Sequence, residues 1–196
     1  MKTIEPVRVK TENQASDVEK KGLEAFKDLM KSIRRTFDKL ESKEIPASVY
    51  IDTQIEGDAK FTFGMIDASI FMKSVETKDM LAGMMKQIGK EIDPVCICLV
   101  TECWMVEEKA GAVKNLDDYK GLTPSEHPDR LEAVLYSFES ENILMQAVDK
   151  IVRVKSLFPG GGEEISLVPW KDLDTMDHIE GRFSNVLKDM KKIKQN

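Results

Sequence analysis

The segment Ser125–Arg130 holds the densest group of reactive side chains in this 196-residue chain. It reads Ser-Glu-His-Pro-Asp-Arg, which places a hydroxyl, two carboxylates, an imidazole and a guanidinium within six residues. His127 is the natural candidate for a general base, because histidine is the usual proton carrier near neutral pH. Asp129 or Glu102 would orient its ring, and Arg130 would hold an anion. These residues would suit a hydrolase or a phosphate-transfer enzyme.

The same segment also has the features of a structural turn. Pro124 and Pro128 restrict the backbone around it. In that interpretation the side chain of Ser125 or Asp129 hydrogen-bonds the backbone, and Arg130 pairs with a nearby carboxylate. Neighbours in sequence rarely converge on one substrate, so the turn is the favoured interpretation. A binding or catalytic loop stays open as the alternative, because loops often carry function.

Metal, cofactor and phosphate-loop chemistry find no support in the spacing of the candidate residues. Cys96, Cys98 and Cys103 lack the C-x₂-C pairing of structural zinc sites, and the chain has no H-E-x-x-H motif. We therefore expect buried, unreactive thiols, no metal and no cofactor. The glycines at 160–162 lack the Lys-Ser/Thr of a phosphate loop, and Ser125 is not in a G-x-S-x-G elbow.

The element that would position the reactive loop is the apolar run Val95–Val106. Both of its alternate residue sets are largely apolar, which predicts a central strand covered on both faces. Glu102 interrupts this pattern, since it shares a face with Val100 and Trp104. A buried carboxylate needs a partner or a raised pKa, so Glu102 is a candidate for function.

Three segments have helical periodicity. Residues 17–42 carry an apolar seam with spacing 3, 4, 3, 4, 3, formed by Leu23, Phe26, Met30, Ile33, Phe37 and Leu40. A second helix should begin near Thr77, as its cap, and reach about Glu91. Its apolar face consists of Met80, Leu81, Met84, Met85, Ile88 and Ile92. Such a face fills an irregular core more often than it forms an adaptable binding surface. A third helix is expected over residues 177–192.

The predicted strands lie between these helices. They cover 47–54, 60–66, 95–106, 131–138, 143–154 and 165–170. The order helix, hairpin, helix, strand, hairpin, strand, helix predicts an α+β fold. We expect one mostly antiparallel sheet of about five to six strands, with N-terminal, middle and C-terminal helices packed on it. Residues 1–16 are expected to form a flexible arm, and 17–196 a single domain.

Composition and charge narrow the classes of partner. Charged residues make up 33% and hydrophobic residues 41% of the chain, which is typical of a globular protein. The net charge of −6 makes nucleic-acid binding unlikely. The chain has no run of about 18 apolar residues and no signal peptide at its start, so we expect no membrane association. An odd number of cysteines favours reduced thiols and a cytoplasmic location.

A resemblance links the strand and the loop. The residues Glu102-Cys103-Trp104-Met105, followed by the segment Gly121–Arg130, resemble a group of uncharacterised microbial proteins. In that group a strand ending in a Glu-x-Trp-like motif precedes a Pro-Ser-Glu-His-Pro-Asp-Arg-like segment. The resemblance covers roughly residues 95–140 and implies no particular activity. It does group Glu102 with the binding candidates Trp104, Ser125 and Glu126.

Two hypotheses of function follow from these observations. The first is a cytoplasmic, non-catalytic interaction or accessory protein that self-associates into a homo-oligomer or binds a protein partner. It is favoured because the sequence contains no complete catalytic set, while two helices with apolar seams flank the sheet. The alternative is a hydrolase or phosphate-transfer enzyme with a site around Ser125–Arg130 and Glu102.

Overall fold

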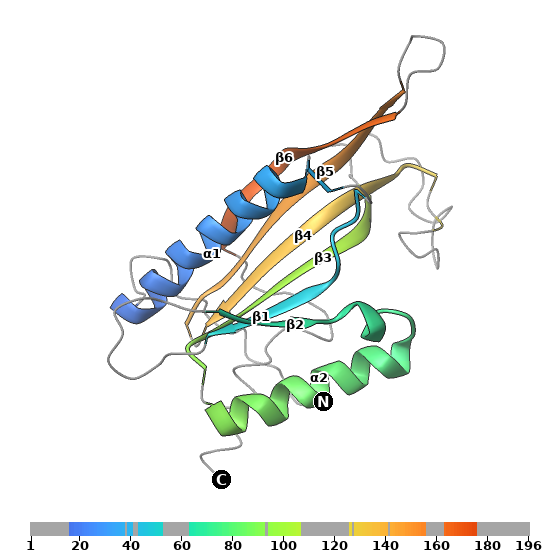
Figure 1. Ribbon diagram of the computed structural model, residues 1–196. Helices are drawn as coiled ribbons and strands as arrows, with labels where there is room; N and C mark the ends of the chain where they lie inside the picture. Colours follow the sequence, from blue (N-terminus) through green and yellow to red (C-terminus); the bar gives the residue numbers. More distant parts are fainter. Residues whose placement is uncertain are drawn as a thin grey trace, which may run out of the picture.

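In a computed structural model, the described part of the chain forms a six-stranded antiparallel sheet with two α helices and a short 3₁₀ helix (Figure 1). The structure describes residues 16–37, 39–40, 43–52, 63–92, 94–106, 126, 128–140, 142–155 and 163–175. The helices are α1 (Asp17–Phe37), η2 (Ser69–Phe71) and α2 (Val75–Ile92). The strands are β1 (Ser48–Asp52), β2 (Phe63–Asp67), β3 (Cys96–Val106), β4 (Arg130–Ser140), β5 (Leu144–Lys155) and β6 (Glu163–Thr175).

The strand order is β2-β1-β3-β4-β5-β6, and every neighbouring pair is antiparallel. The predicted α+β class and the antiparallel sheet are therefore confirmed, as are the N-terminal and middle helices. The predicted C-terminal helix over 177–192 lies outside the described residues. The predicted flexible arm also lies outside them, except for its last residue, Ser16.

Helix α1 lies across one face of the sheet and contacts β3, β4 and β6 (Figure 1). It begins with a capping box: the Ser16 backbone N–H donates to the Glu19 carboxylate at 2.8 Å, and the Glu19 N–H donates back to the Ser16 hydroxyl at 3.3 Å. Four residues of its apolar seam are buried (Leu23, Phe26, Met30 and Phe37), whereas Leu40 beyond the helix is exposed, and the rings of Phe26 and Phe138 lie 5.5 Å apart between centroids. The helix ends at Phe37, short of the predicted residue 42, where i to i−3 hydrogen bonds tighten the backbone.

Strand β3 is covered on both faces over its first half only. Cys96, Cys98 and Val100 belong to the core under α1, whereas Ile97 belongs to a second core under α2. From Thr101 onward the strand is half-buried or exposed. The prediction of a strand covered on both faces is thus confirmed for Cys96–Val100 and wrong for the rest. No β3 residue beyond Val100 belongs to either of the two core clusters.

Helix α2 packs on the opposite face from α1, at the end of the sheet formed by β1 and β2. Its cap is Ser74 rather than the predicted Thr77. The Thr77 N–H donates to the Ser74 hydroxyl at 3.2 Å, and the Ser74 N–H donates to the Thr77 hydroxyl at 3.1 Å. Leu81 and Met85 are buried. No helix in the described part of the chain is both long enough and apolar enough to cross a bilayer.

Candidate functional site

The predicted catalytic set is only partly within the described residues. Ser125 and His127 lie outside them. Glu126 and Asp129 are exposed in the turn before β4, and Arg130 is the exposed first residue of that strand. The arrangement of His127 with its neighbours therefore stays a prediction.

Glu102 has a specific partner that accounts for its place in an otherwise apolar run. Its Oε1 accepts a hydrogen bond from the backbone N–H of Ile45 at 2.6 Å. Ile45 lies in the connector between α1 and β1, 57 residues earlier in the sequence. Burial raises the pKa of the Glu102 carboxyl, and the hydrogen bond from Ile45 opposes that rise. The carboxylate thus holds the connector against the sheet.

Trp104 and Arg130 meet at the far end of β3 and β4. The Arg130 guanidinium lies 5.0 Å from the centroid of the Trp104 ring, within the range of a cation–π contact. Glu132, the register partner of Trp104, accepts a hydrogen bond from Arg153 at 2.6 Å. Trp104 is 41% exposed. This end of the sheet therefore presents charged side chains next to an exposed aromatic ring.

A buried ionic network that the sequence did not indicate joins α1 to the sheet. Arg34 donates two hydrogen bonds to Asp149, from Nε at 2.8 Å and from Nη2 at 2.7 Å. The Tyr136 hydroxyl donates to the same carboxylate at 2.9 Å. Asp149 and Tyr136 are fully buried. Burial raises the pKa of Tyr136, and the adjacent Asp149 charge adds to the rise, so the hydroxyl stays protonated and donates.

A second carboxylate fixes the opposite end of α1. The Oε1 atom of Glu19 accepts hydrogen bonds from the Ser140 hydroxyl at 2.7 Å and from the Asn142 backbone N–H at 3.1 Å. Burial alone would raise the pKa of Glu19. The hydrogen bonds from Ser140, Ser16 and Asn142 outweigh burial and lower that pKa to about 2. Glu19 therefore joins the start of α1 to the turn between β4 and β5.

Asp52 is the one described residue whose buried carboxylate oxygens have no hydrogen-bond partner among the described residues. It is 2% exposed at the end of β1, on the same sheet face as Tyr50 and Cys98. Burial raises its pKa, and the nearby backbone N–H of Val95 offsets part of the rise without forming a hydrogen bond of normal geometry. The described residues contain no group of three or more histidine, cysteine or acidic side chains that could hold a metal ion.

The three thiols are free. Cys96 and Cys98 are buried, as predicted, whereas Cys103 is half-buried. Burial raises the pKa of Cys98 and raises that of Cys103 to about 11. These cysteines are poor candidates for nucleophiles.

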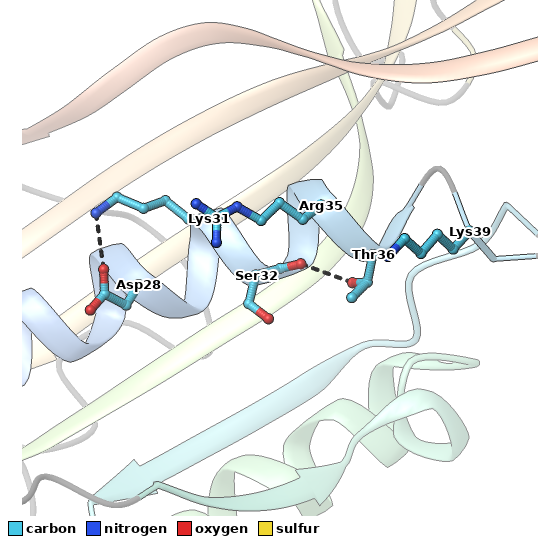
Figure 2. A pocket seen from close by; sticks show the side chains of 6 residues that line it. All are labelled: Asp28, Lys31, Ser32, Arg35, Thr36 and Lys39. Atoms are coloured by element: carbon cyan, nitrogen blue, oxygen red, sulfur yellow. Dashed lines mark hydrogen bonds and ion pairs between the residues drawn. The ribbon is translucent and has the colours of Figure 1, made fainter.

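A groove of about 520 Å³ runs along the outer side of α1 (Figure 2). Its lining consists of Asp28, Lys31, Ser32, Arg35, Thr36 and Lys39. Lys31 is paired with Asp28 at 2.9 Å, and the Thr36 hydroxyl donates to the Ser32 carbonyl at 2.9 Å. Five of the six residues belong to α1 and Lys39 follows its end, so the groove is a furrow between neighbouring side chains. It suits a solvated helix face better than an enclosed ligand site.

Exposed apolar side chains gather in one stretch of the chain instead. Ten large hydrophobic residues are exposed among those described, and five of them fall between β2 and the end of α2. These five are Met65, Ile70, Met80, Met84 and Ile92. The predicted apolar face of α2 is therefore divided, because Leu81 and Met85 pack inward while Met80 and Met84 face outward.

Searches against protein-family models, curated proteins and solved structures gave no match. The resemblance of residues 95–140 to an uncharacterised microbial group stays a prediction. The chemistry and exposure of the residues described above therefore carry the functional proposal.

Proposed function

We propose that the protein is a cytoplasmic, non-catalytic interaction protein that acts by binding a second copy of itself or another protein. The observation that carries this proposal is the exposure of Met80 and Met84, which lie one turn apart on the outer side of α2. Exposed apolar surface marks contact sites in proteins, since each Å² removed from water contributes roughly 25 cal/mol. Methionine suits such surfaces because its flexible thioether chain adapts to different partners.

The carboxylates also support a role other than catalysis. Glu19 and Asp149 are each engaged in holding α1 on the sheet, and Glu102 holds the connector that follows it. A general acid or base needs access to substrate, whereas Glu19 and Asp149 are buried and bonded to the chain itself. Glu102 is exposed, but its Oε1 is bonded to the Ile45 backbone N–H, so we regard a hydrolase or phosphate-transfer enzyme centred on Ser125–Arg130 as the weaker candidate. The three free cysteines are in keeping with a cytoplasmic location.

The test is sedimentation velocity of the full chain from low to high micromolar concentration, together with binding assays on any copurifying protein. We expect either a concentration-dependent rise in sedimentation coefficient or saturable binding of a purified partner. Replacement of Met84 by glutamate should weaken whichever association is found. A chain that stays monomeric throughout and has no saturable partner would contradict the proposal.

A further inference from the structure

The sheet face on which α2 packs extends well beyond that helix. Successive residues of a strand point to opposite faces, and register partners in neighbouring strands point to the same face. By this rule Ala133, Leu135 and Val148 lie on the same face as Ile97, which belongs to the core under α2. Helix α2 covers only the end of the sheet formed by β2, β1 and the start of β3 (Figure 1). The part of this face that β4 and β5 form is therefore a separate surface.

This separate surface is buried, although it belongs to neither of the two cores under the described helices. Ala133 is 0% exposed and Val148 is 4% exposed, yet both are absent from the core under α1 and from the core under α2. Leu144, on the same face, is 9% exposed and is absent from them too. Side chains on an open sheet face keep contact with water, so burial of this degree requires a covering element. The cover must come from a part of the chain other than α1 and α2.

The segment that follows β6 has the sequence of such a cover. Residues 176–196 carry apolar side chains at spacing 4, 3, 4, 3, namely Ile179, Phe183, Val186, Met190 and Ile193. This spacing places all five on one side of a helix. The opposite side would carry Gly181, Ser184 and Lys188. Residues 1–15 show no such periodicity, so the segment after β6 is the better candidate.

The end of β6 places this segment at the correct edge of the sheet. Thr175 is the register partner of Met145, near the start of β5. A helix over residues 177–193 would be about 25 Å long, whereas β5, with 12 residues, is about 40 Å long. A helix that runs back over the sheet from Thr175 would therefore cover Val148 and end short of Val154. Val154 lies on the same face and is 54% exposed, which agrees with a cover of this length.

We propose that residues 177–193 form a third helix that docks on the α2 side of β4 and β5, with its apolar seam against Ala133, Leu135 and Val148. One face of the sheet is then covered by α1, and the other face by α2 and the third helix side by side. The docked segment closes this sheet face to other proteins, so a partner would meet the outer side of α2 instead. The inference does not rest on the proposed function, because docking within one chain needs no partner.

Two native thiols report on the two faces of the sheet. Cys103, the register partner of Ala133, is half-buried on the face of the proposed contact, whereas Cys98 is fully buried in the core under α1. Maleimide labelling of the full chain, followed by peptide mass mapping, measures each thiol separately. Phe183→Asp puts a charge into the seam and should raise the labelling rate of Cys103 at least about tenfold, while Cys98 stays unlabelled. Ser184→Asp puts the same charge on the opposite side of the helix and should change neither rate.

Urea denaturation of the same variants supplies the second measurement. Phe183→Asp should lower the denaturation midpoint by about 1 M or more, and Ser184→Asp should leave it unchanged. Phe183→Ala is the milder change for labelling if the aspartate variant does not fold, and it should also raise the Cys103 rate. An unchanged Cys103 rate in a folded Phe183 variant would overturn the inference, and would mean that another segment or a second copy covers this face.

Sedimentation velocity separates this inference from the proposed function. A chain that stays monomeric and has no partner, but in which Phe183→Asp exposes Cys103, would contradict the proposed function and leave the docked helix standing. An associating chain with an unchanged Cys103 rate would do the reverse.

Discussion

The two long helices pack on opposite faces of one sheet, but they are held in different ways. Helix α1 has a buried apolar seam and is fixed near both ends by carboxylates, Glu19 at its start and Asp149 beneath Arg34. Helix α2 packs through Leu81 and Met85 and leaves Met80 and Met84 exposed. Helix α1 thus uses its buried polar and apolar groups for contacts within the subunit. Helix α2 leaves part of its apolar surface exposed.

The strongest test of the role of α1 is removal of the Asp149 carboxylate. Asp149→Ala leaves the Arg34 guanidinium and the Tyr136 hydroxyl without their shared partner, at a fully buried position. Loss of one member of a buried ionic pair costs about 3 to 5 kcal/mol. Urea denaturation followed by circular dichroism should show a fall of that size in the free energy of unfolding.

The control for this change is Asp28→Ala, which removes an exposed partner of Lys31 on the same helix. Pairs of that kind contribute about 0.2 to 0.5 kcal/mol. If the Asp149 and Asp28 variants lose equal stability, α1 is not fixed by the buried network.

Glu19 should make the stability of the fold depend on pH. Its pKa is about 2 in the folded protein and near 4.5 in an unfolded chain. Its contribution, about 2 to 3 kcal/mol, is fully present above pH 4.5 and is lost as the pH falls toward 2. Glu19→Gln should lower the free energy of unfolding at pH 7 and converge with the wild type near pH 2. Glu24→Gln, at an exposed site paired with Lys27, is the matched control and should show neither effect.

Glu102 should have a smaller effect on stability, through the connector after α1. Glu102→Ala deprives the Ile45 backbone N–H of its acceptor and should cost about 1 to 2 kcal/mol. Glu102→Gln keeps an acceptor oxygen and should cost less than the alanine change. The comparison is made by equilibrium denaturation at neutral pH. An alanine variant as stable as the wild type would show that the Ile45 hydrogen bond does not anchor the connector.

The regular elements could be predicted because their signals are local. Alternating apolar residues indicated the first two strands, a run with both alternate sets apolar indicated β3, and the spacing of Leu23, Phe26 and Met30 indicated α1. The ends were less certain: Ser74 caps α2, although Thr77 was the predicted cap. Either residue type can cap a helix, and the choice depends on the η2 turn that precedes it.

The hydrogen bonds that side chains make between distant elements could not be predicted. Arg34 and Asp149 are 115 residues apart, and Glu19 and Asn142 are 123 apart. In the sequence, Arg34 is one of several charged residues of the helix, and no local pattern distinguishes it from the others. Periodicity also predicted one broad apolar face on α2, whereas in the structure Leu81 and Met85 pack inward and Met80 is exposed.

The difference between the helices is tested most directly by hydrogen–deuterium exchange of the unmodified protein at low and high concentration. The account predicts that amide protection in α2, around Met80–Met84, rises at high concentration or on addition of a saturating protein partner, while α1 stays unchanged because its apolar side is packed within the subunit. Protection in α2 that responds to neither condition, or that rises in α1 alone, would contradict the account.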